Sequence, residues 1–208
     1  MQDFALCDIY CAASFLFGWR YIRSIVRGKS YVRDDDFFFY GVSNEEEFKA
    51  LVNQPDTLLV VGFSYCEKPH ECPVSRFTPD CIHDPEHPVC RQCFVGKTIN
   101  MLPENQTIPL IIPTIHYIAE QIFKIIEANP GKKVLFFITA CEMTLEMFGD
   151  WGMAAGIKGI GVRLDGRICN TMKAFELSEV GIKPGLTVVL PKTQERILQL
   201  LTALQRQS

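Results

Sequence analysis

Residues 134–164 read VLFFITACEMTLEMFGDWGMAAGIKGIGVRL, which is a short apolar run, a helix-length spacer and a second apolar run. The runs at 134–139 and 159–164 have the length of buried strands, and residues 142–154 have the length of a helix. Strands that alternate with helices in this way form βαβ units, whose parallel strands are covered by helices on both faces. This stretch therefore predicts an α/β fold.

The same alternation extends over most of the chain. Further apolar runs occupy residues 58–63, 108–112 and 186–190. Further helix-length segments occupy residues 114–129, 170–181 and 192–206. We expect an α/β domain over residues 58–208, with a mainly parallel, Rossmann-like three-layer sheet that has helices on both faces. A Cys-rich insertion at residues 64–93, poor in aliphatic side chains, interrupts the pattern and indicates a functional loop.

Residues 1–57 are expected to form an N-terminal helical extension. An apolar stripe at helical spacing runs along residues 2–27 and ends before Gly28. Its members are Phe4, Cys7, Cys11, Phe15, Ile22 and Val26. Docking of this stripe on the core is favoured over a membrane-surface helix that uses the arginines at 20, 23 and 27. Asn44, followed by three glutamates, predicts the start of a second helix.

Composition and charge exclude several classes of protein. The chain has 208 residues, of which 48% are hydrophobic and 22% charged, so it should bury a core rather than remain disordered. The formal net charge of −3 gives no electrostatic footprint for nucleic acid. The longest apolar stretch near the start, residues 9–19, is about half of the ~20 residues that a membrane span needs. We therefore expect neither nucleic-acid binding nor a membrane span.

The cysteine content favours a reducing compartment. Nine cysteines are an odd number, and the first residues lack the basic segment that opens a secretory signal. In the cytoplasm, where we place the protein, clustered cysteines more often bind metal or do redox chemistry than form disulfides. Cys90 and Cys93 have the two-residue spacing that lets both thiolates reach one ion.

Other cysteines follow predicted strands. Cys66, Cys141 and Cys169 come after the strands at 58–63, 134–139 and 159–164, and parallel strands place such positions along one edge of the sheet. We therefore expect an iron–sulfur cluster or zinc to be held there by thiolates, with electron transfer to a protein redox partner as one use of a cluster. The candidate ligands are Cys66, Cys72, Cys90, Cys93, Cys141 and Cys169. Six thiolates exceed one tetrahedral site, so either two sites exist or some thiols have another role.

Several alternatives stay open at this stage. Cys81, His70, His83 and His87 lie in the same loop and could complete a mixed site. The rival function is a thiol-dependent enzyme that uses Cys141 or Cys169, with a structural zinc site in the Cys-rich loop. Cys141 would begin a helix, where the helix dipole favours a thiolate. Two further hypotheses are a thiol–disulfide redox couple and a scaffold protein without chemistry. Neither a phosphate-binding loop nor a dinucleotide fingerprint is present.

These cysteine motifs resemble a known family. The set comprises Cys66-x5-Cys72-Pro73, Cys90-x2-Cys93, Ala140-Cys141-Glu142, and Asp165-Gly166 followed by Cys169-Asn170-Thr171. Over residues 58–180 the chain is similar to the bacterial and archaeal cysteine-rich family called domain of unknown function one hundred and sixteen. The resemblance implies a cytosolic metal-binding or redox-linked domain without an established reaction. Phe94-Val95-Gly96 stands where the family often has a third cysteine, so the number of ligands stays open.

Overall fold

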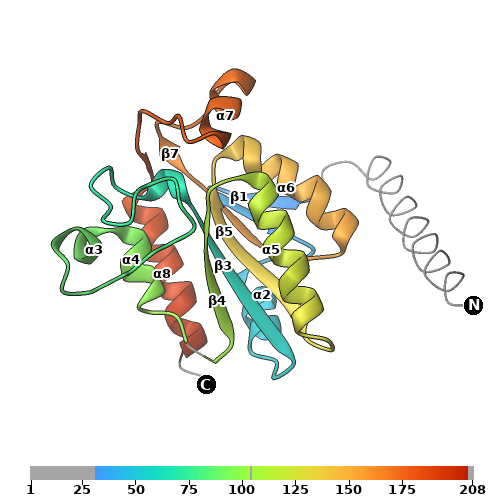
Figure 1. The fold of residues 1–208 in the computed structure, drawn as a ribbon. Coiled ribbons are helices and arrows are strands. Elements are labelled where there is room, and N and C mark those ends of the chain that lie inside the picture. Colours follow the sequence, from blue (N-terminus) through green and yellow to red (C-terminus); the bar gives the residue numbers. More distant parts are fainter. Residues whose placement is uncertain (1–30, 104, 206–208) are drawn as a thin grey trace, which may run out of the picture.

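The computed structural model describes residues 31–103 and 105–205 (Figure 1). Along the chain the elements are β1 (Tyr31–Asp34), β2 (Phe37–Tyr40), α2 (Glu45–Val52), β3 (Thr57–Ser64), the 3-10 helix η1 (Tyr65–Glu67), α3 (Pro88–Gln92), α4 (Phe94–Ile99), β4 (Thr107–Ile112), α5 (Ile115–Ala128), β5 (Lys133–Ala140), α6 (Glu142–Ala155), β6 (Lys158–Arg163), β7 (Asp165–Gly166), α7 (Met172–Glu179), β8 (Thr187–Val188) and α8 (Pro191–Gln205). Across these residues no helix has the length and apolar character that crossing a membrane requires.

The main sheet has six strands in the order β1-β2-β6-β5-β3-β4. β6, β5, β3 and β4 are parallel neighbours, and these are the strands that the apolar runs predict. The predicted α/β class with a mainly parallel sheet is therefore confirmed. β4 forms one outer edge of the sheet and carries Pro109 opposite Val61 of β3. At the other edge, β1 and β2 form an antiparallel hairpin against β6.

Within residues 31–57 the structure differs from the expected helical extension at residues 31–40, which form the β1–β2 hairpin and belong to the main sheet. The helix predicted to start at Asn44 is confirmed as α2. The Asn44 side chain accepts a hydrogen bond from the Glu47 amide at 2.9 Å, and Glu47 accepts one from the Ser43 amide at 2.7 Å. This reciprocal cap satisfies backbone donors at the start of the helix. The helix expected over residues 2–27 lies outside the described residues.

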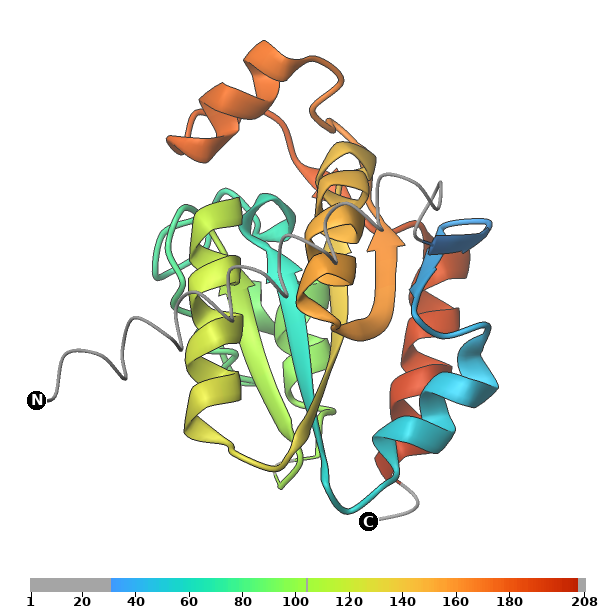
Figure 2. The same ribbon diagram turned by 90° about the vertical axis from the view of Figure 1, so that its right-hand side faces the viewer.

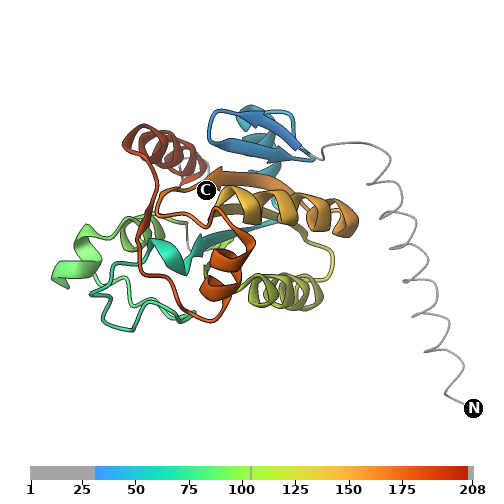
Figure 3. The same cartoon turned by 90° about the horizontal axis from the view of Figure 1, so that it is seen from above.

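Helices cover both faces of the sheet (Figures 2 and 3). α2, α4 and α8 pack on the face to which Leu59, Val61 and Phe63 of β3 point. α5 and α6 pack on the opposite face, against side chains of β2 and β5 such as Tyr40 and Phe136. Side chains of a strand alternate between faces, so a continuous apolar run is required when both faces are buried. This is why the central strands are uninterrupted apolar segments.

A cap segment, residues 165–190, lies above the carboxyl ends of the parallel strands and contains β7, α7 and β8 (Figure 1). The apolar run at 186–190 yields only the two residues of β8, which pair with β7 in a separate antiparallel sheet. Within this run Thr187 and Val189 are buried, whereas Leu186, Val188 and Leu190 are exposed. Alternating burial is the pattern of a strand with one solvent face rather than of a central strand.

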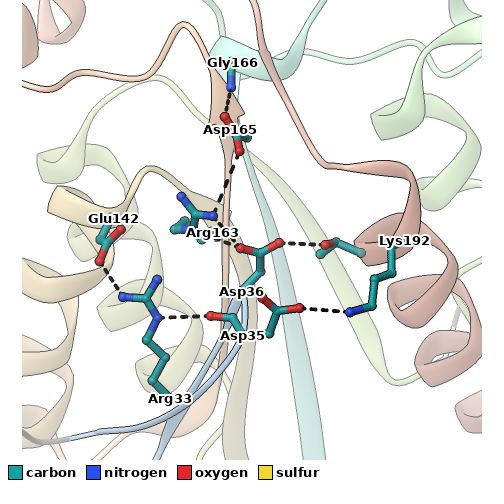
Figure 4. Close-up of polar contacts among 9 residues, drawn as sticks. Arg33, Asp35, Asp36, Glu142, Arg163, Asp165, Gly166 and Lys192 are labelled. Carbon is teal, nitrogen blue, oxygen red and sulfur yellow. Dashed lines mark hydrogen bonds and ion pairs between the residues drawn. The ribbon is translucent and has the colours of Figure 1, made fainter.

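Charged side chains fasten the hairpin to its neighbours (Figure 4). The buried carboxylate of Asp36, 4% exposed, accepts bonds from Arg163 Nε at 2.9 Å and from Thr193 Oγ1 at 2.8 Å. Arg163 Nη2 lies 2.8 Å from the same carboxylate oxygen, Oδ1, whereas Thr193 binds Oδ2, so both oxygens of the carboxylate have partners. Arg33 contacts Glu142 of α6 at 2.6 Å. The turn between β1 and β2 thus contains one buried carboxylate, Asp36, which joins the hairpin to β6 and α8.

Candidate metal centre and sheet-edge pocket

The structure divides the cysteines into two groups that line two different cavities. The loop group is Cys72, Cys81, Cys90 and Cys93. The sheet-edge group is Cys66, Cys141 and Cys169. The six candidate ligands predicted from the sequence therefore do not surround one centre, and Cys81 joins the loop group. All seven of these cysteines are free thiols.

Two consecutive short helices position Cys90 and Cys93 of the loop group. Cys90 lies in α3, and Cys93 is the residue between α3 and α4, with its amide donating to the Val89 carbonyl at 3.0 Å. Gly96 lets α4 approach this turn closely, since a Cβ atom at position 96 would lie only 2.9 Å from the Cys90 carbonyl oxygen. The turn brings both thiols of the two-residue-spaced pair to one small cavity of about 10 Å³.

Histidines take no part in the lining of this cavity. His83 Nδ1 lies 2.8 Å from Asn100 Oδ1, and His87 Nδ1 accepts a bond from the Val89 amide at 3.3 Å, at the start of α3. His70 is exposed. Cysteine is therefore the metal-binding residue type that lines the cavity, which favours thiolate-binding metals over mixed Cys/His coordination.

A buried lysine forms part of the same wall. Lys68 is 1% exposed, and its Nζ donates to the carbonyl oxygen of Asp80 at 2.9 Å and to Thr78 Oγ1 at 3.3 Å. A buried ammonium is costly unless it is hydrogen-bonded or paired with negative charge. These bonds fix a positive charge beside the loop group, and the charge favours ionisation of the Cys81 thiol.

Burial, in contrast to the charge of Lys68, disfavours ionisation of the thiols of the loop group. It raises the pKa of Cys81, Cys90 and Cys93 above the ordinary range of a cysteine. These three thiols therefore hold their protons at neutral pH unless a cation takes the place of the protons. Within residues 31–103 and 105–205, no three His, Cys, Asp or Glu side chains are already arranged to hold a metal ion. Coordination of one ion by the loop group therefore requires its side chains to move closer together.

The sheet-edge group lies where open α/β sheets bind ligands. β3 and β5 are neighbours, but the chain leaves β3 toward the face of α4 and leaves β5 toward the face of α6. Such a divergence opens a crevice at the carboxyl ends of the strands. Cys66 follows β3, Cys141 follows β5, and Cys169 lies in the cap segment above them, as their positions after predicted strands suggest.

The three thiols of this group have different polar partners, and those of Cys66 are Ser64 and Tyr65. Lys183 Nζ lies 3.0 Å from Cys169 Sγ. Cys141 Sγ lies 3.1 Å from Thr144 Oγ1 at the start of α6, and the Cys141 carbonyl accepts the first hydrogen bond of that helix from Leu145. Cys169 is therefore the thiol with a cation in contact, and Cys141 has a hydroxyl instead.

One arginine connects the loop to the cap segment. Arg76 donates to the carbonyl oxygen of Cys66 at 2.6 Å, of Gly185 at 2.6 Å and of Lys183 at 2.8 Å. Since carbonyl oxygens on both sides of the pocket are bound by one guanidinium, the backbones that carry Cys66 and Lys183 are held in fixed relation. A guanidinium presents several donors in a rigid plane, which suits such a bridge.

A buried carboxyl group lies between the two cysteine groups. Glu67 Oε1 accepts bonds from Thr139 Oγ1 and from the Ser64 amide, and Oε2 has no partner within the described residues. Burial raises the pKa of Glu67 from 4.5 to about 8. The group is therefore mainly protonated at neutral pH and ionises as the pH rises through about 8.

Replacing Glu67 by glutamine should flatten the pH dependence of stability. A carboxyl whose pKa is raised on folding contributes stability that is complete below 4.5 and is lost as the pH rises through about 8. Glutamine keeps an acceptor for Thr139 and cannot ionise, so Glu67→Gln should exceed the natural chain in stability above pH 8. Urea unfolding of both chains across this range measures the difference, and parallel pH profiles would contradict the assignment.

Comparison with known proteins adds no relative, because no family model, curated protein or solved structure matches this chain. The resemblance to the cysteine-rich family described above therefore stays a prediction. Fold and site define the protein as a mainly parallel α/β protein with one cysteine group in a loop and a second at the edge of its sheet.

Proposed function

We propose that this protein binds a metal ion through Cys72, Cys81, Cys90 and Cys93, and that the ion is zinc. One observation carries the proposal: these four cysteines line a single small cavity in a loop that offers no histidine to it. Four thiolates in tetrahedral arrangement are a common donor set of structural zinc sites. Free cysteines are often buried as small apolar residues, but four around one cavity exceed what packing of a polar loop requires.

The size of the cavity favours a single ion. A volume of about 10 Å³ is close to that of one water-sized sphere. An iron–sulfur cluster contains several iron and sulfide atoms and would require the loop to move outward. The all-cysteine donor set still makes a cluster the second candidate, with electron transfer to a protein partner as its use.

The charge of the surroundings also fits a thiolate site. A doubly charged cation with four thiolates has a net charge of −2, which is costly to bury. The ammonium of Lys68 in the cavity wall offsets part of this charge. We infer that Lys68 stabilises the metal-bound state without being a ligand.

Such an ion would organise the loop between β3 and β4. We infer a structural role for it, in which the metal holds the loop beside the carboxyl ends of a Rossmann-like three-layer sheet. The free state of all described cysteines supports a reducing compartment such as the cytoplasm.

Metal analysis of the full-length protein, purified anaerobically, tests the proposal. We expect a colourless protein with one zinc ion per chain. Uptake of zinc by metal-free protein in weakly buffered solution should release protons, because burial raises the pKa of at least three of the thiols. A brown protein that contains iron and acid-labile sulfide would show that the site holds an iron–sulfur cluster and not zinc. A protein that neither contains stoichiometric metal nor takes it up would refute the proposal.

A further inference from the structure

We propose that the sheet-edge pocket is a second, metal-independent site, in which the thiolate of Cys169 attacks a small hydroperoxide and Cys66 then closes a disulfide with Cys169. The pocket is separate from the cavity of the loop group, with which it has no lining residue in common. The inference therefore does not depend on the proposed metal site.

The pocket admits only a small ligand. Its volume is about 50 Å³, and its position at the divergence of β3 and β5 is a usual place for a ligand in this class of fold. The Thr187 side chain, 2% exposed, lines the pocket, and its hydroxyl has no hydrogen-bond partner among the described residues. A buried hydroxyl without a partner indicates a missing polar group. A hydroperoxide combines small size with oxygen atoms that can accept such a bond.

Lys183 gives Cys169 the role of nucleophile. The thiolate is the reactive form of cysteine, and a neighbouring ammonium stabilises negative charge on sulfur. Lys183 Nζ lies 3.0 Å from Cys169 Sγ, and no other hydrogen bond of this ammonium is found within the described residues. Two of its N–H groups are therefore available to the oxygen that leaves when the O–O bond breaks.

Cys66 suits the role of second thiol. It is buried in the wall of the same pocket, and Lys183 and Cys169 are both close enough to influence its ionisation. Burial raises the pKa of Cys66, so it keeps its proton while Cys169 reacts. Arg76, which binds the carbonyl oxygens of Cys66 and Lys183, keeps the two sides of the pocket together.

The steps balance in atoms and electrons. The Cys169 thiol first loses its proton to solvent. The thiolate sulfur then forms a bond to the terminal oxygen of the hydroperoxide, the O–O bond breaks, and the leaving oxygen takes a proton from Lys183, which regains one from solvent. The sulfenic acid of Cys169 is then attacked by the Cys66 sulfur, and water leaves with the Cys66 proton. Two thiols lose two electrons in total, and the hydroperoxide is reduced to an alcohol or, from hydrogen peroxide, to water.

Peptide mapping under non-reducing conditions tests the proposal. The full-length protein as purified, with its metal content measured, is treated with one equivalent of hydrogen peroxide and then with an alkylating agent. We expect a disulfide between Cys66 and Cys169 as the first product. In Lys183→Met its rate of formation should fall at least about tenfold. Lys173→Met, at an exposed position of the same cap segment, should keep the rate of the natural chain.

Two further readouts separate reaction from folding. Lys183→Arg, which keeps the positive charge, should recover part of the rate that Lys183→Met loses. Cys66→Ser should leave Cys169 as a sulfenic acid, detectable by its added mass. A first disulfide that uses Cys141 or a loop cysteine would overturn the proposal, as would equal rates in Lys183→Met and Lys173→Met. Metal content should be the same in all these variants, so failure here is distinct from failure of the zinc proposal.

Discussion

Cys90→Ser is expected to lose zinc and to loosen the loop between β3 and β4. A serine hydroxyl is a poor substitute for a thiolate, and the free energy of binding at a structural site is also folding free energy. We expect the affinity for zinc to fall by at least about 100-fold. Competition with a chromogenic chelator measures the affinity, and limited proteolysis should show faster cleavage within residues 65–103. Cys93→Ser should behave in the same way.

The matched control is Cys141→Ser, since Cys141 belongs to the sheet-edge group. Its zinc content and its zinc affinity should equal those of the natural chain. If Cys141→Ser lowered the metal content as much as Cys90→Ser, the two groups would act as one centre and the division of the cysteines would have no chemical meaning. Unchanged zinc binding in Cys90→Ser would exclude the loop group as the metal site.

The second large effect is expected for Asp36→Ala. The change removes the carboxylate oxygen that contacts both Nε and Nη2 of Arg163, and the second oxygen, which accepts from Thr193 Oγ1. A half-buried guanidinium would lose its main counter-ion, because the next carboxylate, of Asp165, lies 4.0 Å away. Removing one partner of a buried ion pair costs several kcal/mol, and we expect a loss of about 3 kcal/mol in the free energy of unfolding. Urea denaturation at neutral pH measures it.

Asp35→Ala is the control for this change, one residue away in the same turn. Asp35 pairs with Lys192 at 3.3 Å, but the side chains are 58% and 87% exposed. Exposed pairs contribute little, so the expected loss is under about 1 kcal/mol. Similar losses for Asp35→Ala and Asp36→Ala would mean that burial of the Asp36 carboxylate does not strengthen the attachment of the hairpin.

Much of the fold could be predicted from hydrophobic pattern alone. Strands β3, β5 and β6 are apolar runs because both of their faces are buried, and helices such as α5 fill the spacers between the strands. β1 escaped prediction, since Val32, Arg33 and Asp34 are all exposed and give no apolar run. Its strand conformation depends on pairing with β2, which is tertiary information.

The candidate site could be predicted only in part. Cys66 and Cys141 each follow the end of a strand. Because these strands are parallel neighbours, both residues lie at the same edge of the sheet and line the same pocket. No comparable rule predicts the path of a long polar loop. Nothing in the sequence therefore indicates that the loop group lines a different cavity from the sheet-edge group. Cys81 has no motif spacing to its neighbours, and Lys183 reaches Cys169 only because the cap segment folds back on itself.

The edges of the sheet also bear on how the molecule behaves in concentrated solution. Strand borders with free amides invite other chains to add on, and this is a route to aggregation. Pro109 on β4 has no amide hydrogen that could bond to an added strand. A proline is tolerated at this position because an outermost strand forms hydrogen bonds with a neighbouring strand on one side only. The opposite border, β1, is four residues long and carries Arg33 and Asp34. Both outermost strands thus disfavour edge-to-edge pairing between the sheets of two copies of the protein.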